Sequence, residues 1–511
     1  MKRKKELIVV IASLLVIVLS ATAAYFTTRI LGTGKKVSAT IADLKIVFTS
    51  GNGSINGTNI EPGWSSGENT FTVKNESDET YNYNIIIKDL VNTFVTKGFL
   101  VYKITSTDGG YNMTDFADVP KSTHQVDTIL SRGISIAQGK THTYKVEFKY
   151  LESSTVDQTE DMAKKLTGQI FIEKSYQNTL GLKIIEDNPT ISERTDFSTA
   201  FTTNTANTLY KSTENAVDVY YFAGQDTAST PINNWVKFAG FYWRIIRTNF
   251  DGSVRIIFSG TSSDTTEGYI GMRGFNRYSN SPKYVGYMYG NSDTTLENAR
   301  TNTNDSYIKT FIDNWYKNNL TSYTNYLSKN AIYCNNRVLS SNYTYTTNRT
   351  SDPSNSFYFK NYNESGAPTY NCENNKDAFS VNNSEAKLTY PIALITIGEI
   401  VFAGGKYGIR APMWYYTNSL YNSITANHFW WTMTPDGWSS MEDDGTMAPA
   451  FGDYNESQVY LISGANSRLA TLSVTYGYAV RPVTSLKSCV QWKSGDGSAT
   501  NPYEIVENGG C

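Results

Sequence analysis

The residue types that most enzymes use for acid–base or nucleophilic chemistry are scarce in this chain. It has only three histidines, and only His428 lies in an aromatic segment, shortly before Trp430 and Trp431. A histidine beside large rings is more often packed and hydrogen-bonded than a general base. No nucleophile elbow, zincin motif or phosphate-binding loop accompanies it. The sequence therefore predicts no catalytic residues, no cofactor and a protein that is not an enzyme.

Two acidic clusters contain the hard oxygen ligands that calcium prefers. One is Glu442–Gly445 together with Asp453, and the other is Asp264–Glu267. Neither has the spacing of an EF-hand loop. Because charged side chains are mostly exposed, we interpret both clusters as solvated turn acids and predict no metal site.

Aromatic side chains are the remaining candidates for binding. Six lie in segments rich in Asn, Ser and Gly, namely Trp414, Tyr415, Tyr416, Tyr421, Trp438 and Tyr454. Rigid rings among small polar residues are typical of binding loops, where they supply contact area at low entropic cost. They would stack on sugars or contact a protein partner, and the alternative is core packing. We expect core packing for Trp243, Trp430 and Trp431, and a recognition region within residues 412–460.

The four cysteines, Cys334, Cys372, Cys489 and Cys511, all lie in the C-terminal part of the chain without a CxxC pair. In an exported chain an even number of cysteines favours disulfides over zinc. Three connectivities are open. The most local one pairs Cys334 with Cys372 and Cys489 with Cys511.

Residues 1–31 indicate export. Four positive charges precede an apolar run from Leu7 to Ala24, which is about as long as a bilayer span. Ala21-Thr22-Ala23 has the pattern that signal peptidase accepts. A retained membrane anchor and a cleaved signal peptide are both open. Either one places the rest of the chain on the extracellular side of the membrane or in the medium.

Composition narrows the class of protein further. The chain has 511 residues, enough for two or three domains, and a formal net charge of −2. No basic block follows the first five residues, which argues against nucleic acid as a partner. The 37 tyrosines and 37 glycines, with many small polar residues, favour sheets joined by turns.

A first module at residues 36–174 has the pattern of an all-β sandwich. Residues 143–150 alternate strictly between polar and apolar types, as expected for a strand with one buried face. Further strands are predicted at 71–74, 83–87 and 166–172, with turn-prone residues between them.

Short motifs resemble the camelysin and TasA-type family of secreted bacterial proteins. They are the export-signal end Ala21–Phe26, Glu61-Pro-Gly63 before the strand at 71–75, and the late strand Gly168–Ile172. The resemblance implies a jelly-roll-like sandwich. Some family members form extracellular fibres by donating an N-terminal strand to a neighbour. The corresponding segment here is 37–48, which we predict to be a strand, with donation as the alternative.

Residues 175–208 are rich in Thr, Ser and Asn and are predicted to be a linker. A second module at 209–488 follows. Its predicted elements are a hairpin over 235–258 with an Asp-Gly turn, and helices near 306–316 and 395–404. Asn304 or Asp305 would cap the first helix.

The order of hairpin, helix, Cys334, helix, Trp430-Trp431 and Arg481-Pro-Val resembles a bacterial surface-domain family of unknown function with a C-type-lectin-like fold. The resemblance implies an α+β domain with long exposed loops. Formylglycine-generating enzymes share that fold, and their activity would require reactive cysteines in the late part of the core. Cys489 instead follows the Arg-Pro-Val strand, which speaks against that activity. The tail at 489–511 is predicted to be a disulfide-closed turn structure.

These observations predict a bacterial cell-surface or secreted protein that displays an adhesin-like, C-type-lectin-like binding domain on a β-sandwich. The expected partner is a surface protein or a glycan, with the membrane added if residues 1–31 are retained. The alternative is a structural subunit of an extracellular fibre or biofilm matrix, which would self-assemble through the sandwich. A third hypothesis is an oxidase or hydrolase on the lectin-like fold.

Overall fold

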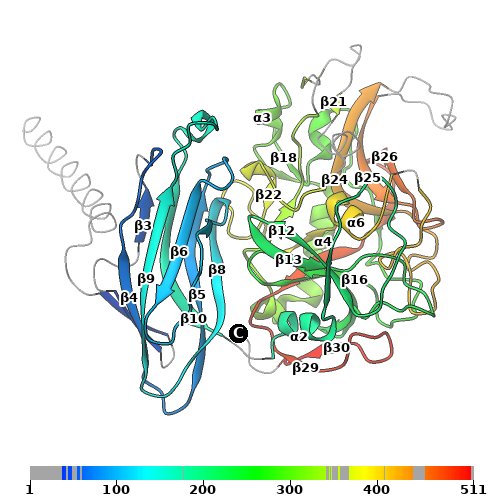
Figure 1. Ribbon diagram of the computed structural model, residues 1–511. Helices are drawn as coiled ribbons and strands as arrows, with labels where there is room; N and C mark the ends of the chain where they lie inside the picture. Colours follow the sequence, from blue (N-terminus) through cyan, green and yellow to red (C-terminus); the bar gives the residue numbers. More distant parts are fainter. Residues whose placement is uncertain are drawn as a thin grey trace, which may run out of the picture. The chain divides into compact units, whose positions relative to one another are not determined.

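The protein is mainly β, with several antiparallel sheets and few short helices among the described residues (Figure 1). The computed structural model describes residues 37–41, 44–48, 54–57, 60–175, 178–340, 344–345, 347, 355–356, 368–407, 409–440 and 455–507. They fall into two compact units, which divide between Tyr176 and Gln177. The predicted signal or anchor at 1–31 lies outside the described residues. None of the described helices has the length and apolar character needed to cross a membrane.

The first unit contains two antiparallel sheets, whose strand orders are β1-β2-β4-β9-β6-β7 and β3-β10-β5-β8. The strands are β1 (Val37–Ile41), β2 (Leu44–Phe48), β3 (Ser54–Gly57), β4 (Asn69–Asn75), β5 (Tyr81–Asn92), β6 (Leu100–Ser106), β7 (Ala117–Asp118), β8 (Ser122–Ile136), β9 (Thr141–Tyr150) and β10 (Leu166–Lys174), with the short 3-10 helix η1 (Thr159–Asp161) before β10. All four strands predicted for this module are confirmed.

Side chains from both sheets meet in the core of the first unit. The alternation in β9 buries Tyr144, Val146, Phe148 and Tyr150, as its sequence predicts. The Tyr83 hydroxyl on β5 lies 2.8 Å from Nδ1 of His142 and 2.5 Å from the Tyr144 hydroxyl.

The histidines of the first unit, His124 and His142, are not surface residues. Both side chains are buried, because β8 and β9 turn these positions toward the interior of the unit.

The segment at 37–48 pairs within this chain. Its two strands form a hairpin, in which Val37 lies opposite Phe48, and β2 then pairs with β4. This leaves β1 as an edge strand.

The second unit begins inside the segment that was predicted to be a linker, and that prediction is corrected here. Helix α2 (Leu180–Asp187) is capped by the Thr179 side chain and buries Leu180 and Ile184. Strand β11 (Thr190–Glu193) then pairs in parallel with β12 (Thr208–Glu214). The apolar face of α2 and this strand pairing attach the segment to the second unit.

Two larger sheets organise the second unit. One runs β11-β12-β13-β15-β14-β30-β29, and β16, β28 and β23 extend it from β15; the other runs β17-β27-β24-β25-β26, with β21 beside β24. Their remaining strands are β13 (Val217–Tyr221), β14 (Trp235–Phe238), β15 (Phe241–Thr248), β16 (Val254–Phe258), β17 (Met272–Arg273), β21 (Asn355–Ser356), β23 (Ile392–Leu394), β24 (Trp430–Ser440), β25 (Asn455–Ile462), β26 (Leu469–Ser473), β27 (Tyr478–Ala479), β28 (Pro482–Leu486), β29 (Trp492–Ser494) and β30 (Tyr503–Ile505).

Short elements complete this unit. They are the strand pairs β18 (Met288–Tyr289) with β19 (Asn304–Asp305) and β20 (Tyr333–Cys334) with β22 (Ala378–Phe379), the helices α3 (Leu296–Ala299), α4 (Tyr307–Asn319) and α6 (Ile397–Phe402), and the 3-10 helices η2 (Pro282–Val285), η3 (Thr321–Tyr326) and η4 (Asn375–Asp377).

The predicted hairpin and both predicted helices are present. Strands β15 and β16 pair antiparallel around the Asp-Gly turn. The cap of α4 differs from the prediction: it is Ser306, whose hydroxyl accepts a hydrogen bond from the Lys309 amide. A serine at that position satisfies a free helix amide directly.

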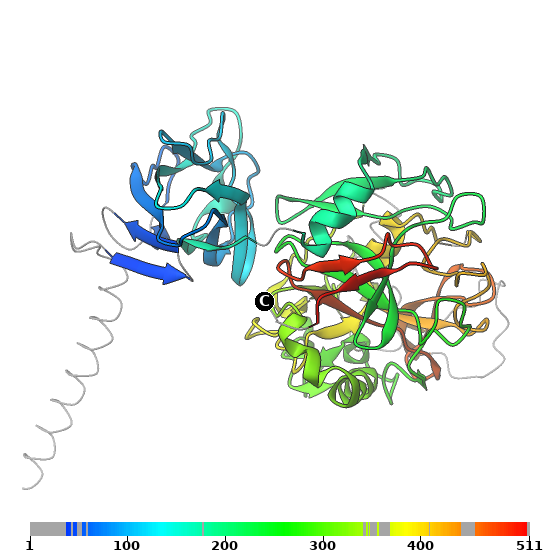
Figure 2. The same ribbon diagram turned by 90° about the horizontal axis from the view of Figure 1, so that it is seen from below.

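The C-terminal tail is part of the main sheet and does not stand apart as a separate structure (Figure 2). Strand β30 pairs in parallel with β14, and the Trp235 amide donates to the Gly497 carbonyl at 2.8 Å. The Tyr503 hydroxyl donates to Oδ2 of Asp187 in α2 at 3.0 Å. The tail and the former linker therefore hold each other within the second unit.

Candidate ligand-binding surface

Most of the aromatic residues that the sequence proposed for binding are part of the core. Trp414 and Tyr415 are fully buried, and Trp438 and Tyr416 are nearly so. The Trp414 indole donates to the Phe222 carbonyl at 3.0 Å, and the Tyr416 hydroxyl donates to the Gly464 carbonyl at 2.6 Å. Rings without exposed surface cannot stack on a ligand, so for these residues the binding prediction is corrected to core packing.

Tyr421 remains a candidate, because 39% of it is exposed. It lies in a turn next to the exposed Leu420, and the buried Asn418 side chain accepts from the amides of Leu420 and Asn422, each at 3.0 Å. Tyr454, the sixth predicted residue, lies outside the described residues.

The other predicted groups do not form a chemical site in the described part. His428 is exposed, and its ring lies edge-on to Tyr269 at 6.0 Å, away from the packed position that we expected. Asp264 accepts a hydrogen bond from Ser262, as in a simple turn. The cluster at 442–445 and Asp453 lies outside the described residues. Within them, no three metal-ligating side chains come together.

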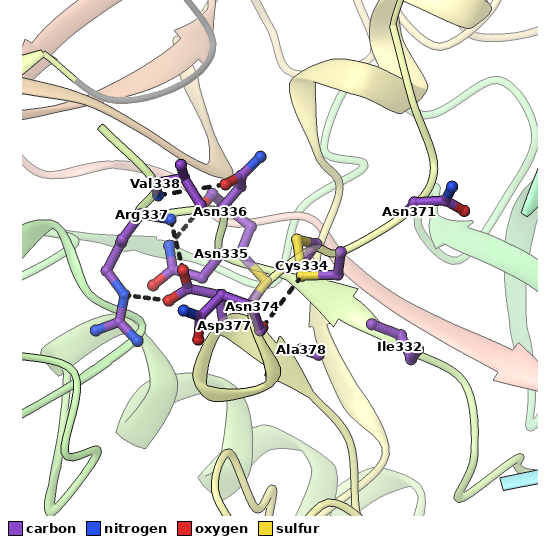
Figure 3. The surroundings of a disulfide bond; sticks show 12 residues. Ile332, Cys334, Asn335, Asn336, Arg337, Val338, Asn371, Asn374, Asp377 and Ala378 are labelled. Atoms are coloured by element: carbon purple, nitrogen blue, oxygen red, sulfur yellow. Dashed lines mark hydrogen bonds and ion pairs between the residues drawn. A yellow bond between two sulfur atoms is a disulfide. The ribbon is translucent and has the colours of Figure 1, made fainter. Parts of the chain in front are cut away.

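The disulfide between Cys334 and Cys372 confirms the predicted pairing (Figure 3). It closes a segment with a sequence separation of 38. Next to it, Arg337 pairs with the buried carboxylate of Asp377 at 2.7 Å. Cys489 is also disulfide-bonded, and its predicted partner Cys511 lies outside the described residues.

Buried ion pairs stiffen the core of the second unit, and sequence reasoning missed them. Arg247 makes two hydrogen bonds to Glu214, at 2.7 and 3.0 Å. Glu399 lies 3.1 Å from Nε of Arg247 and 3.2 Å from Nε of Arg255. All four side chains are buried. Paired guanidinium and carboxylate groups fix the positions of the strands and helices that bear them.

A different group of aromatic residues reaches the surface, with Tyr278 exposed and its neighbours half-buried. Tyr278 has 59% of its surface exposed, and its ring centroid lies 5.8 Å from that of Tyr284. Tyr284 in turn lies 5.2 Å from Tyr289. Beside them, Arg273 and Arg277 contact the Tyr307 ring, with Cζ at 5.0 and 4.5 Å from its centroid. We call these six residues the tyrosine–arginine surface.

Rigid local structure positions this surface. Ser281 caps η2, which carries Tyr284, and the Ser457 amide at the start of β25 donates to the Ser279 carbonyl at 2.9 Å. Tyr307 is the first residue of α4, and Arg273 lies on β17. Short elements from four places in the sequence therefore meet beside one end of the predicted recognition region.

The two arginines of the surface are held by aromatic contacts and not by acids. The Arg273 guanidinium donates to the Tyr307 hydroxyl at 2.9 Å and also stacks on Phe311, with Cζ 4.7 Å from the centroid. Among the described residues, no carboxylate forms an ion pair with Arg273 or Arg277. Asp305 lies nearby, but its carboxylate pairs with Lys309 at 3.1 Å.

The hydroxyls of Tyr284 and Tyr289 stay protonated at neutral pH. Burial and a neighbouring tyrosine raise the pKa of both Tyr284 and Tyr289 above the ordinary value of 10.0. Each can therefore donate as well as accept a hydrogen bond. The segment at 278–289 was not among the predicted binding residues, although it also places tyrosines among Ser, Asn and Gly and the same composition rule could have found it.

Comparisons with known proteins leave the family open. No family model and no curated protein matches the chain. Four chains of solved structures match it. One of them is described as "AvmM Catalyzes Macrocyclization in Alchivemycin A Biosynthesis"; it is 15% identical, with a TM-score of 0.13, over 21% of this chain and 69% of that one. A similarity at this level does not establish a shared fold or activity.

Proposed function

We propose that this chain is a cell-surface or secreted binding protein of the adhesin type. The second unit, as a C-type-lectin-like domain, recognises a ligand through the tyrosine–arginine surface, and the first unit, as a jelly-roll-like sandwich, displays it. The observation that carries this proposal is the 59% exposure of Tyr278, which lies in a tyrosine cluster, in a unit whose tryptophans are mostly buried.

Such a surface has the properties of a recognition site. Tyrosine and arginine are the residue types that contribute most to binding energy at interfaces. Their rotamers are restricted here by the ring contacts among Tyr278, Tyr284 and Tyr289 and by the stacking of Arg277 on Tyr307. Side chains that are already ordered lose less entropy on binding.

The export pattern of residues 1–31 and the disulfide chemistry support the extracellular location. Cys334 is joined to Cys372, and Cys489 is also oxidised. Disulfides of this kind persist in oxidising compartments and are rare in the cytosol.

The test compares the purified full chain with the double variant Tyr278→Ala/Tyr284→Ala. The measurement is retention on whole cells and on a glycan array. The matched control is Tyr407→Ala, which also removes an exposed tyrosine, whose ring lies 6.2 Å from that of Tyr460. We expect the double variant to lose at least about tenfold in affinity, as two interface tyrosines of ~1 kcal/mol each imply. Retention equal to that of the control would contradict the proposal.

One observation favours the fibre as a second candidate. Strand β1 (Val37–Ile41) lies at the edge of its sheet and pairs with β2. An edge strand can template pairing with another chain. Deletion of residues 37–48 should then abolish concentration-dependent filaments of the mature chain, and a chain that stays monomeric at high concentration argues against this candidate.

A further inference from the structure

We propose that the ligand of the tyrosine–arginine surface is a carboxylated glycan, such as a chain containing uronic or sialic-type acids. This inference rests on the proposed function of that surface and adds the chemical class of the ligand. Three features lead to it: two arginines without an acidic partner among the described residues, an exposed tyrosine ring beside two half-buried ones, and surrounding amides and hydroxyls.

The two arginines of the surface lie close together. Arg273 and Arg277 both lie against the Tyr307 ring, so two positive charges are held close together without a carboxylate partner among the described residues. Like charges in proximity repel unless an anion compensates them. The nearby acids are engaged, since Asp305 pairs with Lys309 and Asp293 accepts a hydrogen bond from Ser281. An incoming carboxylate would supply the missing charge.

The geometry of guanidinium suits this group. A planar guanidinium binds a carboxylate through two parallel N–H···O bonds. Arg277 is exposed, and its stacking on Tyr307 restricts the plane of its side chain. Arg273 is more buried and tied to the Tyr307 hydroxyl, so it would contribute mainly charge. We therefore assign the direct carboxylate contact to Arg277.

The tyrosine rings fit sugars. Tyr278 and Tyr284 are inclined by 44°, and Tyr284 and Tyr289 by 75°. Tyr278 is the exposed ring of the three, so it presents the main face for packing against the C–H groups of a sugar. The hydroxyls of all three tyrosines make no hydrogen bond to a described residue. They are therefore available to the hydroxyl groups of a glycan.

The neighbouring polar groups favour a glycan over an acidic peptide. Asn291 is exposed beside the surface, and Ser292 and Thr294 place further hydroxyls next to it. An extended peptide binds mainly by adding a strand to a free sheet edge. The strand at this surface, β18, is two residues long and already pairs with β19. It offers little backbone for strand addition, whereas amides and hydroxyls match a ligand rich in hydroxyl groups.

The test measures the affinity of the purified full chain by calorimetry for three acidic probes: oligogalacturonate, oligomannuronate and sialyllactose. Maltohexaose serves as the neutral glycan and a poly-glutamate peptide as the acidic peptide. The variant is Arg277→Gln, which keeps a polar side chain without the charge. Arg410→Gln is its control, because Arg410 is also exposed and lies outside the surface.

We expect at least one acidic glycan to bind the wild-type chain and Arg277→Gln to weaken that binding at least about tenfold, as loss of a charge-assisted hydrogen bond implies. Arg410→Gln should leave it unchanged, and Arg277→Lys should restore part of it, because lysine keeps the charge without the paired donors.

Three results would overturn the inference: binding of maltohexaose as tight as that of the acidic probes, preference for poly-glutamate, or no binding of any acidic glycan. If the Tyr278→Ala/Tyr284→Ala variant still loses cell retention in those cases, the proposed function stands and only the ligand class is wrong. If cell retention is also unaffected, both proposals fail.

Discussion

The substitution Glu399→Gln tests whether the buried ion pairs hold the second unit together. The Glu399 carboxylate accepts a hydrogen bond from Nε of Arg247 at 3.1 Å and forms an ion pair with Arg255, whose Nε lies 3.2 Å away. Its second oxygen accepts from the Thr396 amide at 3.0 Å, which completes the capping box at the start of α6. With Glu214, the network contains two positive and two negative charges, and 1% of the Glu399 side chain is exposed.

Glutamine at this position removes one charge and replaces one carboxylate oxygen by an amide nitrogen, which cannot accept the hydrogen bond from Arg247. It has the same shape, and its carbonyl oxygen can still accept from the Thr396 amide, since capping boxes use Gln as well as Glu. The network is left with an uncompensated buried guanidinium. Removal of one partner from a buried pair costs about 3–5 kcal/mol, which is the loss that we expect in the free energy of unfolding. Glu399→Ala should cost about 1 kcal/mol more, because it also removes the hydrogen bond at the cap.

The effect should depend on pH in one direction. Burial alone would raise the pKa of Glu399, but Arg255 and Arg247 and the Thr396 amide together hold it below the ordinary value of 4.5. A carboxyl group with a lowered pKa in the folded state contributes stability above the ordinary pKa and loses it as the pH falls through the folded value. The difference between wild type and Glu399→Gln should therefore be largest near neutral pH and shrink below about pH 4.

Urea unfolding followed by tryptophan fluorescence reports this change, because every tryptophan except Trp64 lies in the second unit. The control is Glu186→Gln, which removes a carboxylate that is 74% exposed and 3.5 Å from Lys183. Its loss should stay within about 0.5 kcal/mol. A loss below about 1 kcal/mol for Glu399→Gln at neutral pH, or one that does not shrink in acid, would refute the assignment.

Two further predictions concern other parts of the molecule. Replacement of Cys334 and Cys372 together by serine should lower the free energy of unfolding of the second unit by about 4 kcal/mol, because the disulfide no longer restricts a loop of this length in the unfolded chain. The same urea transition measures this loss, and an unchanged midpoint would contradict the prediction. In the first unit, burial alone would raise the pKa of Asp161, but hydrogen bonds from Thr96, Val95 and Tyr150 lower it below 3.8. Asp161→Asn should therefore destabilise this unit by about 1–3 kcal/mol at neutral pH. The difference between the two proteins should fade as the pH falls below 3.8. Hydrogen exchange of the β9 amides measures it, and equal exchange in both proteins would show that the carboxylate contributes nothing.

Local patterns were sufficient to predict some of the regular elements. The strict alternation in β9 and the helical spacing of Ile308 and Ile312 in α4 each specify one buried face, and the structure buries those faces. The linker and tail predictions were wrong because β11 and β30 join the main sheet by parallel pairing with β12 and β14. In the case of β30 the partner strand lies far away in the sequence, so no local periodicity reports the pairing.

The buried arginines were missed for a related reason. Arg244, Arg247 and Arg255 lie on β15 and β16. In a hairpin with one apolar face we expect charged side chains to face water, yet all three are buried. Glu399 is an acidic partner of Arg247 and Arg255, and it is more than 140 residues away in the chain from both. A charged side chain in a strand is normally solvated. Its burial costs desolvation free energy, which here a carboxylate from a distant part of the chain offsets.

Partners from distant segments also bear on why one set of rings is buried and the other is not. Trp414 and Tyr278 both lie among small polar residues, so composition alone treats them alike. The polar atom of Trp414 meets the carbonyl of Phe222, and that of Trp431 meets the carbonyl of Arg273 at 2.8 Å. Such a partner stabilises a buried indole, and for Trp414 and Trp431 a distant segment provides it. Tyr415 and Trp438 are buried by packing alone, because their polar atoms have no hydrogen-bond partner among the described residues. The ring neighbour of Tyr278 is Tyr284, six positions along the chain, and its hydroxyl has no partner among the described residues. A large ring that the fold neither covers nor satisfies retains its full capacity to bind, and this property distinguishes Tyr278 from the aromatic residues that composition first suggested.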